Sequence, residues 1–285
     1  MESILTKSLL QKNIGTPQQL DMAIKEVLQE LILVSLSTTD FFSKAGFYGG
    51  TSLRVFHGLR RFSEDLDFAL LKEDCDFRWT PYFKQIEQTF QRFGLRIETI
   101  EREKISATDT RSAFIKENAI ETMKILLPDD MPLPSINHNQ VTTIKFEVDT
   151  VPPEGATYEW LNLSQPFFAN IRVFDIPSLF AGKISAVLLR QWKNRVKGRD
   201  FYDYLYYVGR GAKINMAYLS QNLAKTGRKE ELSLDGLKKL LAERFETIDF
   251  QEAAKETARF LEKAEEVDCW DKDLFLSTLD RLEAR

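Results

Sequence analysis

The sequence predicts an α+β fold in which a mixed sheet with flanking helices is followed by a helical domain. Three observations lead to this fold class. The stretch 141–149 alternates apolar and polar residues as a half-buried strand does, and most of the chain after residue 176 repeats apolar residues at helical spacing. Strands and helices do not alternate as they do in parallel α/β proteins. We therefore expect a first domain at residues 1–170 and a helical domain at residues 171–285.

The first domain begins with a helix that has a clear start signal. Thr16 is its expected N-cap, Pro17 its first residue, and Gln19 completes a capping-box pattern. We expect this helix to end before a small-residue turn at Gly46. A second helix, amphipathic through its phenylalanines, is expected to end at Gly94.

The remaining elements follow from periodicity and from turn-forming residues. Alternation predicts strands at 95–101, 113–116 and 141–149. Three prolines predict a loop over 128–138. In the second domain, apolar spacing predicts helices at 178–196, 200–208, 214–225, 233–245, 249–267 and 271–284.

The composition is that of a globular protein, with 43% hydrophobic and 29% charged residues. No apolar run approaches the length of a membrane span, and the N-terminus lacks the apolar stretch of a signal peptide. Cys75 and Cys269, the two cysteines, form neither a metal-ligand pattern nor a disulfide framework. We therefore expect a cytoplasmic protein. Because the net charge is −4, any nucleic-acid contact must come from a local basic patch.

The segment 49–67 carries the strongest functional signal. It opens with Gly49, Gly50 and Thr51 and closes with two aspartates, Asp65 and Asp67, around a leucine. Small residues let the backbone approach a phosphate and present amide N–H groups at a helix N-terminus. In a strand, alternate side chains share a face, so both carboxylates would point to one spot, as ligands of Mg²⁺ do. Together, the turn and the paired aspartates indicate nucleotide chemistry.

These residues resemble the signature of the polymerase-beta-like nucleotidyltransferase superfamily, with thirteen residues between Thr51 and Asp65. The fuller string, in which Arg61 and Ser63 precede the aspartates, is similar more narrowly to the AbiEii/AbiGii toxin-type nucleotidyltransferases. The resemblance implies an N-terminal nucleotidyltransferase-like domain that transfers a nucleoside monophosphate from a nucleoside triphosphate. It also implies a Mg²⁺ cofactor, with two ions possible.

The resemblance also assigns roles to single residues. From its position two residues before Asp65, Ser63 is expected on the same strand face, where it would contact the triphosphate or a metal-bound water, and a role in a turn is the alternative. In the second domain, Lys183 would bind the triphosphate and a following aspartate would assist catalysis. Asp200 and Asp203 both fit that description, although either could instead pair with Arg199. Asp200 is also the expected N-cap of its helix.

A third carboxylate would complete the metal site, because nucleotidyl transfer with two ions needs more ligands than two aspartates supply. The strand 141–149 places Lys145, Glu147 and Asp149 on one face. Glu147 is the first candidate for the third ligand and Asp149 the second. A polar strand face that is open to solvent is the alternative interpretation.

Positive charge is concentrated near the start of the second domain. Arg190 lies seven residues after Lys183, so both share a helix face, and Arg190 is a further candidate for nucleotide binding. An RNA backbone would contact the rest of this basic cluster, which consists of Lys193, Arg195, Lys197 and Arg199.

With the family resemblance, these motifs imply a toxin of a toxin–antitoxin or phage-defence system. The implied acceptor is the 3′ end of tRNA, and the implied partner is an antitoxin of the winged-helix type. A small-molecule acceptor such as an aminoglycoside is the first alternative. A catalytically silent binding module is the second, and the intact Asp65, Asp67 and Lys183 argue against it.

Overall fold

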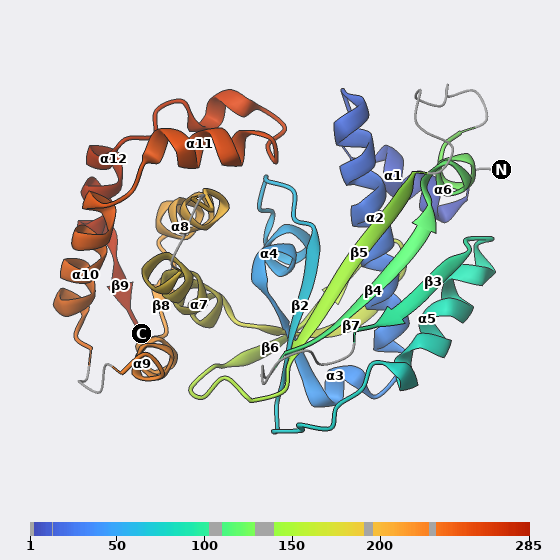
Figure 1. The fold of residues 1–285 in the computed structure, drawn as a ribbon, viewed down its shortest axis with the longest axis horizontal. Coiled ribbons are helices and arrows are strands. Elements are labelled where there is room, and N and C mark those ends of the chain that lie inside the picture. Colours follow the sequence, from blue (N-terminus) through green and yellow to red (C-terminus); the bar gives the residue numbers. More distant parts are fainter. Residues whose placement is uncertain (1–2, 13, 103–109, 129–139, 191–195, 228–231) are drawn as a thin grey trace. The chain divides into compact units, whose positions relative to one another are not determined.

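The computed structural model describes residues 3–12, 14–102, 110–128, 140–190, 196–227 and 232–285 (Figure 1). It divides into two compact units. The first unit consists of Met1–His57, Ser63–Pro152 and Trp160–Val173. The second consists of Gly58–Phe62, Pro153–Glu159 and Phe174–Arg285. Two short segments that precede residue 160 therefore belong to the second unit.

The first unit is built on a seven-stranded mixed sheet with the order β3-β4-β5-β2-β1-β7-β6. The mixed α/β architecture confirms the predicted fold class. β2 runs antiparallel to β1 and parallel to β5, so the sheet is mixed at its centre. The strands are β1 Ala45–Tyr48, β2 Asp65–Leu70, β3 Ile97–Glu101, β4 Thr110–Asn118, β5 Val141–Asp149, β6 Tyr158–Leu163 and β7 Ala169–Phe174.

The three predicted strands are confirmed as β3, β4 and β5, the last with both ends correct. The sequence prediction missed β6 and β7. β7 alternates buried and exposed residues, so its signal was present. β6 is an edge strand with little full burial, and its pattern is weak for that reason. Most of the predicted loop 128–138 lies outside the described residues.

The helices of the first unit are α1 Ile4–Leu10, α2 Pro17–Ser37, α3 Phe41–Lys44, α4 Gly49–His57, α5 Thr80–Arg92 and α6 Ala119–Leu126. The predicted start of α2 is confirmed, because the Thr16 hydroxyl accepts the backbone N–H of Gln19 at 3.2 Å. Gly94, with φ +76°, ends α5 as expected. The expected turn at Gly46 is wrong: this residue lies inside β1 between two buried neighbours. The sequence prediction did not include α6.

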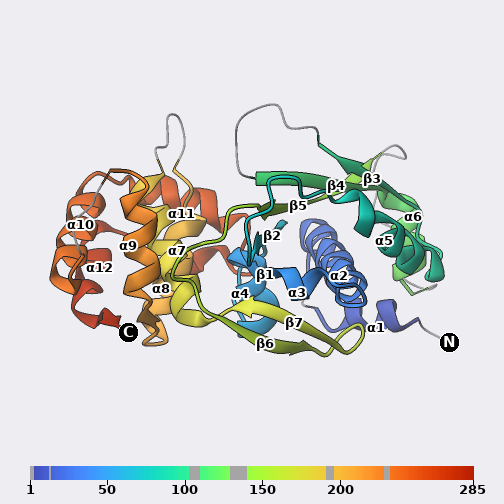
Figure 2. The ribbon, with the colours of Figure 1, turned by 90° about the horizontal axis from the view of Figure 1, so that it is seen from below.

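The sheet curves around α2, which lies inside it (Figure 2). Residues 26–36 of this helix are all buried, so α2 is enclosed on every side over three turns. Rings pack beside it in an aromatic core: Phe41 stacks on Trp79 with 5.3 Å between centroids, and Trp79 meets Phe146 edge-on at 4.7 Å. Phe68 of β2 joins this core, at 5.0 Å from Phe41. One face of β2 is therefore fixed by packing.

The second unit is helical apart from a two-stranded ladder of β8 Lys213–Ile214 and β9 Glu283–Ala284. Its α-helices are α7 Ile176–Leu189, α8 Arg199–Gly209, α9 Met216–Ala224, α10 Leu234–Glu246, α11 Phe250–Ala258 and α12 Lys272–Ser277. Two predicted helices are too long. The helix expected at 249–267 ends at Ala258, and the one expected at 271–284 is α12, a 3₁₀ turn and β9. The helix expected at 178–196 ends at Leu189, because Arg190 is extended with ψ 120°.

None of the helices in the described ranges is long and apolar enough to cross a membrane.

Candidate active site

The two aspartates of the first unit lie at the start of β2, on the face turned away from the aromatic core. Asp65 and Asp67 are partly exposed, whereas Leu66 and Phe68, which alternate with them, are completely buried. Burial of the apolar side chains fixes the rotation of the strand. Both carboxylates therefore share one face, as the alternation predicts.

The glycine turn contacts the second of these aspartates. Gly49 directly follows β1, has φ +82° and begins α4. A Cβ atom at this position would lie 2.5 Å from Oδ2 of Asp67, so only glycine fits both the backbone and the space. The structure thus brings the N-terminus of α4, a site that favours anions, beside the Asp67 carboxylate. Gly50 lies in the first turn of the same helix.

Thr51 and Ser63 both make contacts within the first unit that differ from the expected contact with the substrate. Thr51 is buried, and its hydroxyl donates a 2.5 Å hydrogen bond to the carbonyl oxygen of Asp65. Its hydroxyl therefore holds β2 in place. The expectation that Ser63 lies on the strand face is wrong, because β2 begins at Asp65. The carbonyl of Ser63 instead accepts a hydrogen bond from the Gln29 side chain.

The candidate third ligands lie on β5, which is parallel to β2. Glu147 is opposite Asp67 in the register, and Lys145 is opposite Asp65. The Nζ atom of Lys145 is 2.6 Å from Oε2 of Glu147, and the Ser112 hydroxyl donates to Oε1 at 2.5 Å. Glu147 is therefore adjacent to the aspartate pair but already has two partners.

The alternative ligand, Asp149, lies further along β5. It is opposite Ala69, and its two carboxylate oxygens accept hydrogen bonds from Tyr48 at 2.7 Å and from Thr110 at 2.8 Å. Within the described ranges, no three His, Cys, Asp or Glu side chains are grouped as they would be to hold a metal ion. The register favours Glu147 over Asp149, and neither is drawn into a cluster with the aspartate pair.

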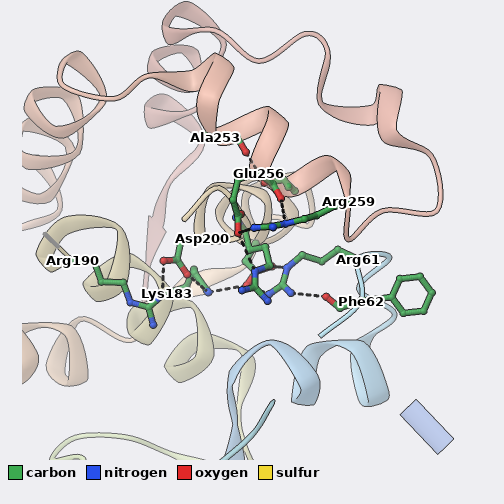
Figure 3. A network of polar contacts seen from close by, with 11 residues as sticks. Arg61, Phe62, Lys183, Arg190, Asp200, Ala253, Glu256 and Arg259 are labelled. Atoms are coloured by element: carbon green, nitrogen blue, oxygen red, sulfur yellow. Dashed lines mark hydrogen bonds and ion pairs between the residues drawn. The ribbon is translucent and has the colours of Figure 1, made fainter. Parts of the chain in front are cut away.

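The second unit contains another pair of aspartates, on α8. Asp200 and Asp203 are three residues apart, and both are ion-paired with the Lys183 ammonium group of α7. Figure 3 shows the Asp200 carboxylate next to this ammonium group. The Nζ atom lies 2.7 Å from Oδ1 of Asp200 and 2.8 Å from Oδ2 of Asp203. The spacing on one helix face brings both carboxylates to a single cation.

Arg61 completes this group and was not among the predicted site residues. It is 3% exposed, and its Nε and Nη2 atoms each lie 2.6 Å from an oxygen of Asp203, which makes the ion pair bidentate. Burial by itself would raise the pKa of Asp203, but Arg61 and Lys183 lower it below the usual value. The arginine stands in the same motif as Asp65, and this is the one signal that the sequence offered.

Arg190 closes the network at its exposed end. Its Nη1 atom lies 2.6 Å from Oδ2 of Asp200, and its side chain is 44% exposed. Burial would raise the pKa of Asp200, but Lys183 and Arg190 lower it to about 2. Three cations, Arg61, Lys183 and Arg190, thus face two carboxylates. Of these side chains, that of Arg190 is the most exposed to solvent.

Residues 31–278 match a protein family described as nucleotidyl transferase AbiEii toxin, type IV TA system. The chain belongs to this family. It is therefore a nucleotidyltransferase, and its family role is that of a toxin with a nucleotide substrate and an antitoxin partner. The predicted family and enzyme class are confirmed.

Three solved structures are similar to this AbiEii protein. MenT4, a nucleotidyltransferase toxin from Mycobacterium tuberculosis, is 16% identical, with a TM-score of 0.49 over 96% of this chain and 92% of that chain. A putative nucleotidyltransferase from H. pylori is 17% identical, with a TM-score of 0.47 over 90% of this chain and 89% of that chain. JHP933 from Helicobacter pylori is 16% identical, with a TM-score of 0.46 over 88% of this chain and 85% of that chain. Among curated proteins there is no match.

In this AbiEii protein, Asp200 is not the N-cap of α8, which corrects the prediction. Gly198 is the N-cap, and Asp200 lies buried in the first turn. A Cβ atom on Gly198 would overlap the carbonyl oxygen of Ala253 in α11, so the start of α8 packs directly on that helix. Glu256 of α11 then accepts the backbone N–H of Arg199 at 3.3 Å, and a side chain from another helix does the work of the cap.

The predicted basic cluster is described only in part. Lys193 and Arg195 lie outside the described residues. The Arg199 guanidinium is 4.0 Å from the Phe260 ring centroid and 3.8 Å from Glu256. Lys197 is partly buried, and burial, then Arg190 and other cations, lower its pKa.

Proposed function

We propose that this AbiEii-family nucleotidyltransferase uses Mg²⁺ held by Asp65 and Asp67 to add a nucleoside monophosphate to the 3′ end of tRNA. The observation that carries the proposal is the close approach of Gly49 to the Asp67 carboxylate. A metal-binding carboxylate and a helix N-terminus suited to phosphate meet there at one place.

The aspartate pair fits the chemistry of Mg²⁺. Magnesium is usually bound by one or two carboxylates and fills its remaining positions with water and substrate phosphates. Two carboxylates on one strand face meet that requirement without a third protein ligand. When bound, the ion would polarise the phosphoryl oxygens and stabilise the charge of the leaving group. Glu147 would join as a third ligand only if its ion pair with Lys145 opened.

The residues of the first unit would orient the reacting groups. The amide N–H groups at Gly49 and Gly50 would bind the phosphates, and Asp65 and Asp67 would hold the α-phosphate through the metal. The oxygen of the acceptor hydroxyl would attack the α-phosphorus and lose its proton to water. The bond from that phosphorus to the bridging oxygen would break, and pyrophosphate would leave with its electron pair.

For Lys183 and Arg190, the proposed contact with the triphosphate rests on charge. Both side chains carry a positive charge, and that of Arg190 is the exposed part of the network around them. Asp200 and Asp203 would hold the lysine in place. Their burial supports this positioning role for both and favours neither as a proton acceptor.

The acceptor and the biological role are the finer part of the proposal. A net charge of −4 gives the protein no general attraction to RNA, so Lys193, Arg195, Lys197 and Arg199 would supply the phosphate contacts. Of these, Arg199 is engaged by Glu256 and would contribute least. Blocking the 3′ end of tRNA would stop aminoacylation, which fits a toxin in phage defence. A winged-helix antitoxin would be its partner.

The test is to incubate the wild type and Asp67→Asn with each labelled nucleoside triphosphate and total RNA. We expect one nucleoside triphosphate to label the 3′ end of tRNA, and only when the wild-type protein and Mg²⁺ are both present. Gel mapping and 3′-end sequencing identify the product. Label found solely on the protein or on a small molecule such as an aminoglycoside would contradict tRNA as acceptor. Equal labelling by Asp67→Asn would remove this aspartate from the mechanism.

Salt dependence tests the basic cluster separately. If Lys193 and Arg195 each neutralise one RNA phosphate, replacing both by alanine should reduce the slope of log K against log salt by about 1.4–1.8. An unchanged slope would place the RNA contact elsewhere on the molecule.

A further inference from the structure

A buried glutamine holds the chain directly before the metal-binding strand. The Nε2 group of Gln29, on α2, donates to the carbonyl oxygen of Glu64 at 2.8 Å and to that of Ser63 at 3.2 Å. The next carbonyl, that of Asp65, accepts the Thr51 hydroxyl at 2.5 Å. Three consecutive carbonyl groups are therefore fixed by side chains at the point where β2 begins.

The place of Gln29 in α2 argues that these bonds matter. Gln29 is 1% exposed, and its neighbours Leu28, Leu31 and Ile32 are completely buried. A carboxamide at such a position costs free energy unless its polar atoms are bonded. Both hydrogens of Nε2 have acceptors, whereas Oε1 has no hydrogen-bond partner in the part of the chain that the structure describes. An apolar residue would serve packing better, so the donors explain the glutamine.

We propose that Gln29 is a positioning residue for the metal site. By holding the carbonyls of Ser63 and Glu64, it sets where β2 begins and in which direction Asp65 and Asp67 point. The inference rests on the proposed binding of Mg²⁺ by these aspartates.

The physical basis is the strictness of Mg²⁺ coordination. The ion demands near-octahedral geometry at short distances, so small displacements of a carboxylate weaken binding. Groups that orient metal ligands indirectly typically contribute 10–100-fold to metal affinity or activity. Gln29 acts on the backbone one and two residues before Asp65, and β2 continues to Asp67 without a break. We therefore expect an effect at the lower end of that range.

Gln29→Met is the variant that tests this inference, because methionine has a similar length and no donor. The matched control is Ser35→Ala, which removes a buried 2.7 Å hydrogen bond from Ser35 to the Leu31 carbonyl within the same helix. Binding of Mn²⁺, used in place of Mg²⁺ and followed by electron paramagnetic resonance, reports on the site without catalysis. Rates of nucleotidyl transfer at varied Mg²⁺ and triphosphate concentrations give kcat and KM.

We expect Gln29→Met to weaken Mn²⁺ binding about tenfold and to lower kcat by a similar factor. The KM for the triphosphate at saturating Mg²⁺ should change much less. Ser35→Ala should leave both the Mn²⁺ affinity and kcat at wild-type values, even if its melting temperature falls as much as that of Gln29→Met. If Gln29→Met does not fold, Gln29→Glu replaces it in the same comparison, because it keeps the length and offers at most one donor.

Mn²⁺ affinity and kcat of the Gln29 variant equal to those of Ser35→Ala would overturn the inference. Asp67→Asn separates this result from a failure of the proposed function. If Asp67→Asn also binds Mn²⁺ as the wild type does, the metal site itself is assigned to the wrong residues. If Asp67→Asn loses binding and the Gln29 variant does not, only the role of Gln29 is wrong.

Discussion

The two units each contain a pair of aspartates on one face of an element, and the surroundings of the pairs differ in kind. Asp65 and Asp67 are two residues apart on a strand and partly exposed, next to a glycine turn. Asp200 and Asp203 are three residues apart on a helix, buried, and paired with Lys183 at 2.7 and 2.8 Å. Spacing alone makes both pairs candidate sites.

The difference shows how burial separates a chemical role from a positioning role. A buried carboxylate must be compensated by cations in the fold, and once compensated it has little capacity left for a substrate. A partly exposed carboxylate can exchange water for a metal ion at small cost to the fold. The comparison therefore supports our proposal that the strand pair takes part in the chemistry and that the helix pair holds Lys183 in place.

The largest expected effect is on activity, at the strand pair. Asp67→Asn removes the charge of a proposed metal ligand at a partly exposed position, and Asp65→Asn does the same. We expect either change to reduce transfer more than about 100-fold, beyond the loss typical of indirect partners of a metal. The melting temperature should stay close to that of the wild type. Near-wild-type turnover of either variant at saturating Mg²⁺ would contradict a catalytic role for the strand pair.

The helix pair should respond in stability instead. Asp203→Asn leaves the Arg61 guanidinium buried without its carboxylate, and breaking a buried pair in this way costs about 3–5 kcal/mol of unfolding free energy. Urea unfolding measures the loss. Replacing both partners, Arg61→Met with Asp203→Leu, should recover part of it, since the Arg61 charge is removed and Lys183 keeps Asp200 at 2.7 Å. A cost below about 1 kcal/mol for the single variant would contradict a compensated buried pair.

Glu117 is buried on β4, and its contribution to the unfolding free energy of the first unit falls as the pH rises. Burial raises the pKa of Glu117 to about 7, and a hydrogen bond from Thr122 offsets the rise only partly. Because the pKa of Glu117 in the folded protein exceeds the ordinary value of 4.5, this stability is present below about pH 4.5 and lost as pH rises through 7. Glu117→Gln should therefore stabilise the protein at pH 8 by up to about 3 kcal/mol. Measuring the unfolding free energy of the wild type and of Glu117→Gln at pH 5 and at pH 8 tests this prediction.

Asp200 should give the second unit the opposite dependence. Lys183 and Arg190 overcome the effect of burial and hold the pKa of Asp200 at about 2, below the ordinary value of 3.8. Its stabilising contribution, about 2 kcal/mol, is present above pH 4 and lost as pH falls through 2. Asp200→Asn should make the loss of stability between pH 4 and 2 shallower. An acid-unfolding profile parallel to that of the wild type would show that the cations do not act through Asp200.

The smallest expected effect concerns the glycine turn. Gly49→Ala and Gly94→Ala both place a side chain at positive φ, at +82° and +76°, which costs about 1–3 kcal/mol. Only at Gly49 does the new Cβ meet Oδ2 of Asp67; at Gly94 its nearest neighbour is Cδ1 of Ile125 at 3.9 Å. Similar stability losses with reduced transfer in Gly49→Ala alone would show that the turn shapes the metal site. Equal activity in both would separate the turn from the site.

Local patterns in the sequence determined much of the first unit. The cap at Thr16 predicted the start of α2, and alternation predicted β5 residue for residue. The same alternation predicted that Asp65 and Asp67 share a face, because side chains on a strand repeat every two residues whatever the strand packs against. The lengths of the late helices were wrong, since apolar spacing continues through turns that tertiary packing imposes.

Only the tertiary structure decided which of these residues act together. Arg61 and Asp203 are 142 positions apart, and Gln29 precedes the Glu64 carbonyl by 35. No local period relates residues at such distances, because their contact depends on how separate elements pack. The same holds for Asp200, where burial beside Lys183 turned an expected cap into a buried ion pair. The sequence by itself thus determined the reactive groups, and packing decided which of them are held, compensated and left accessible to solvent.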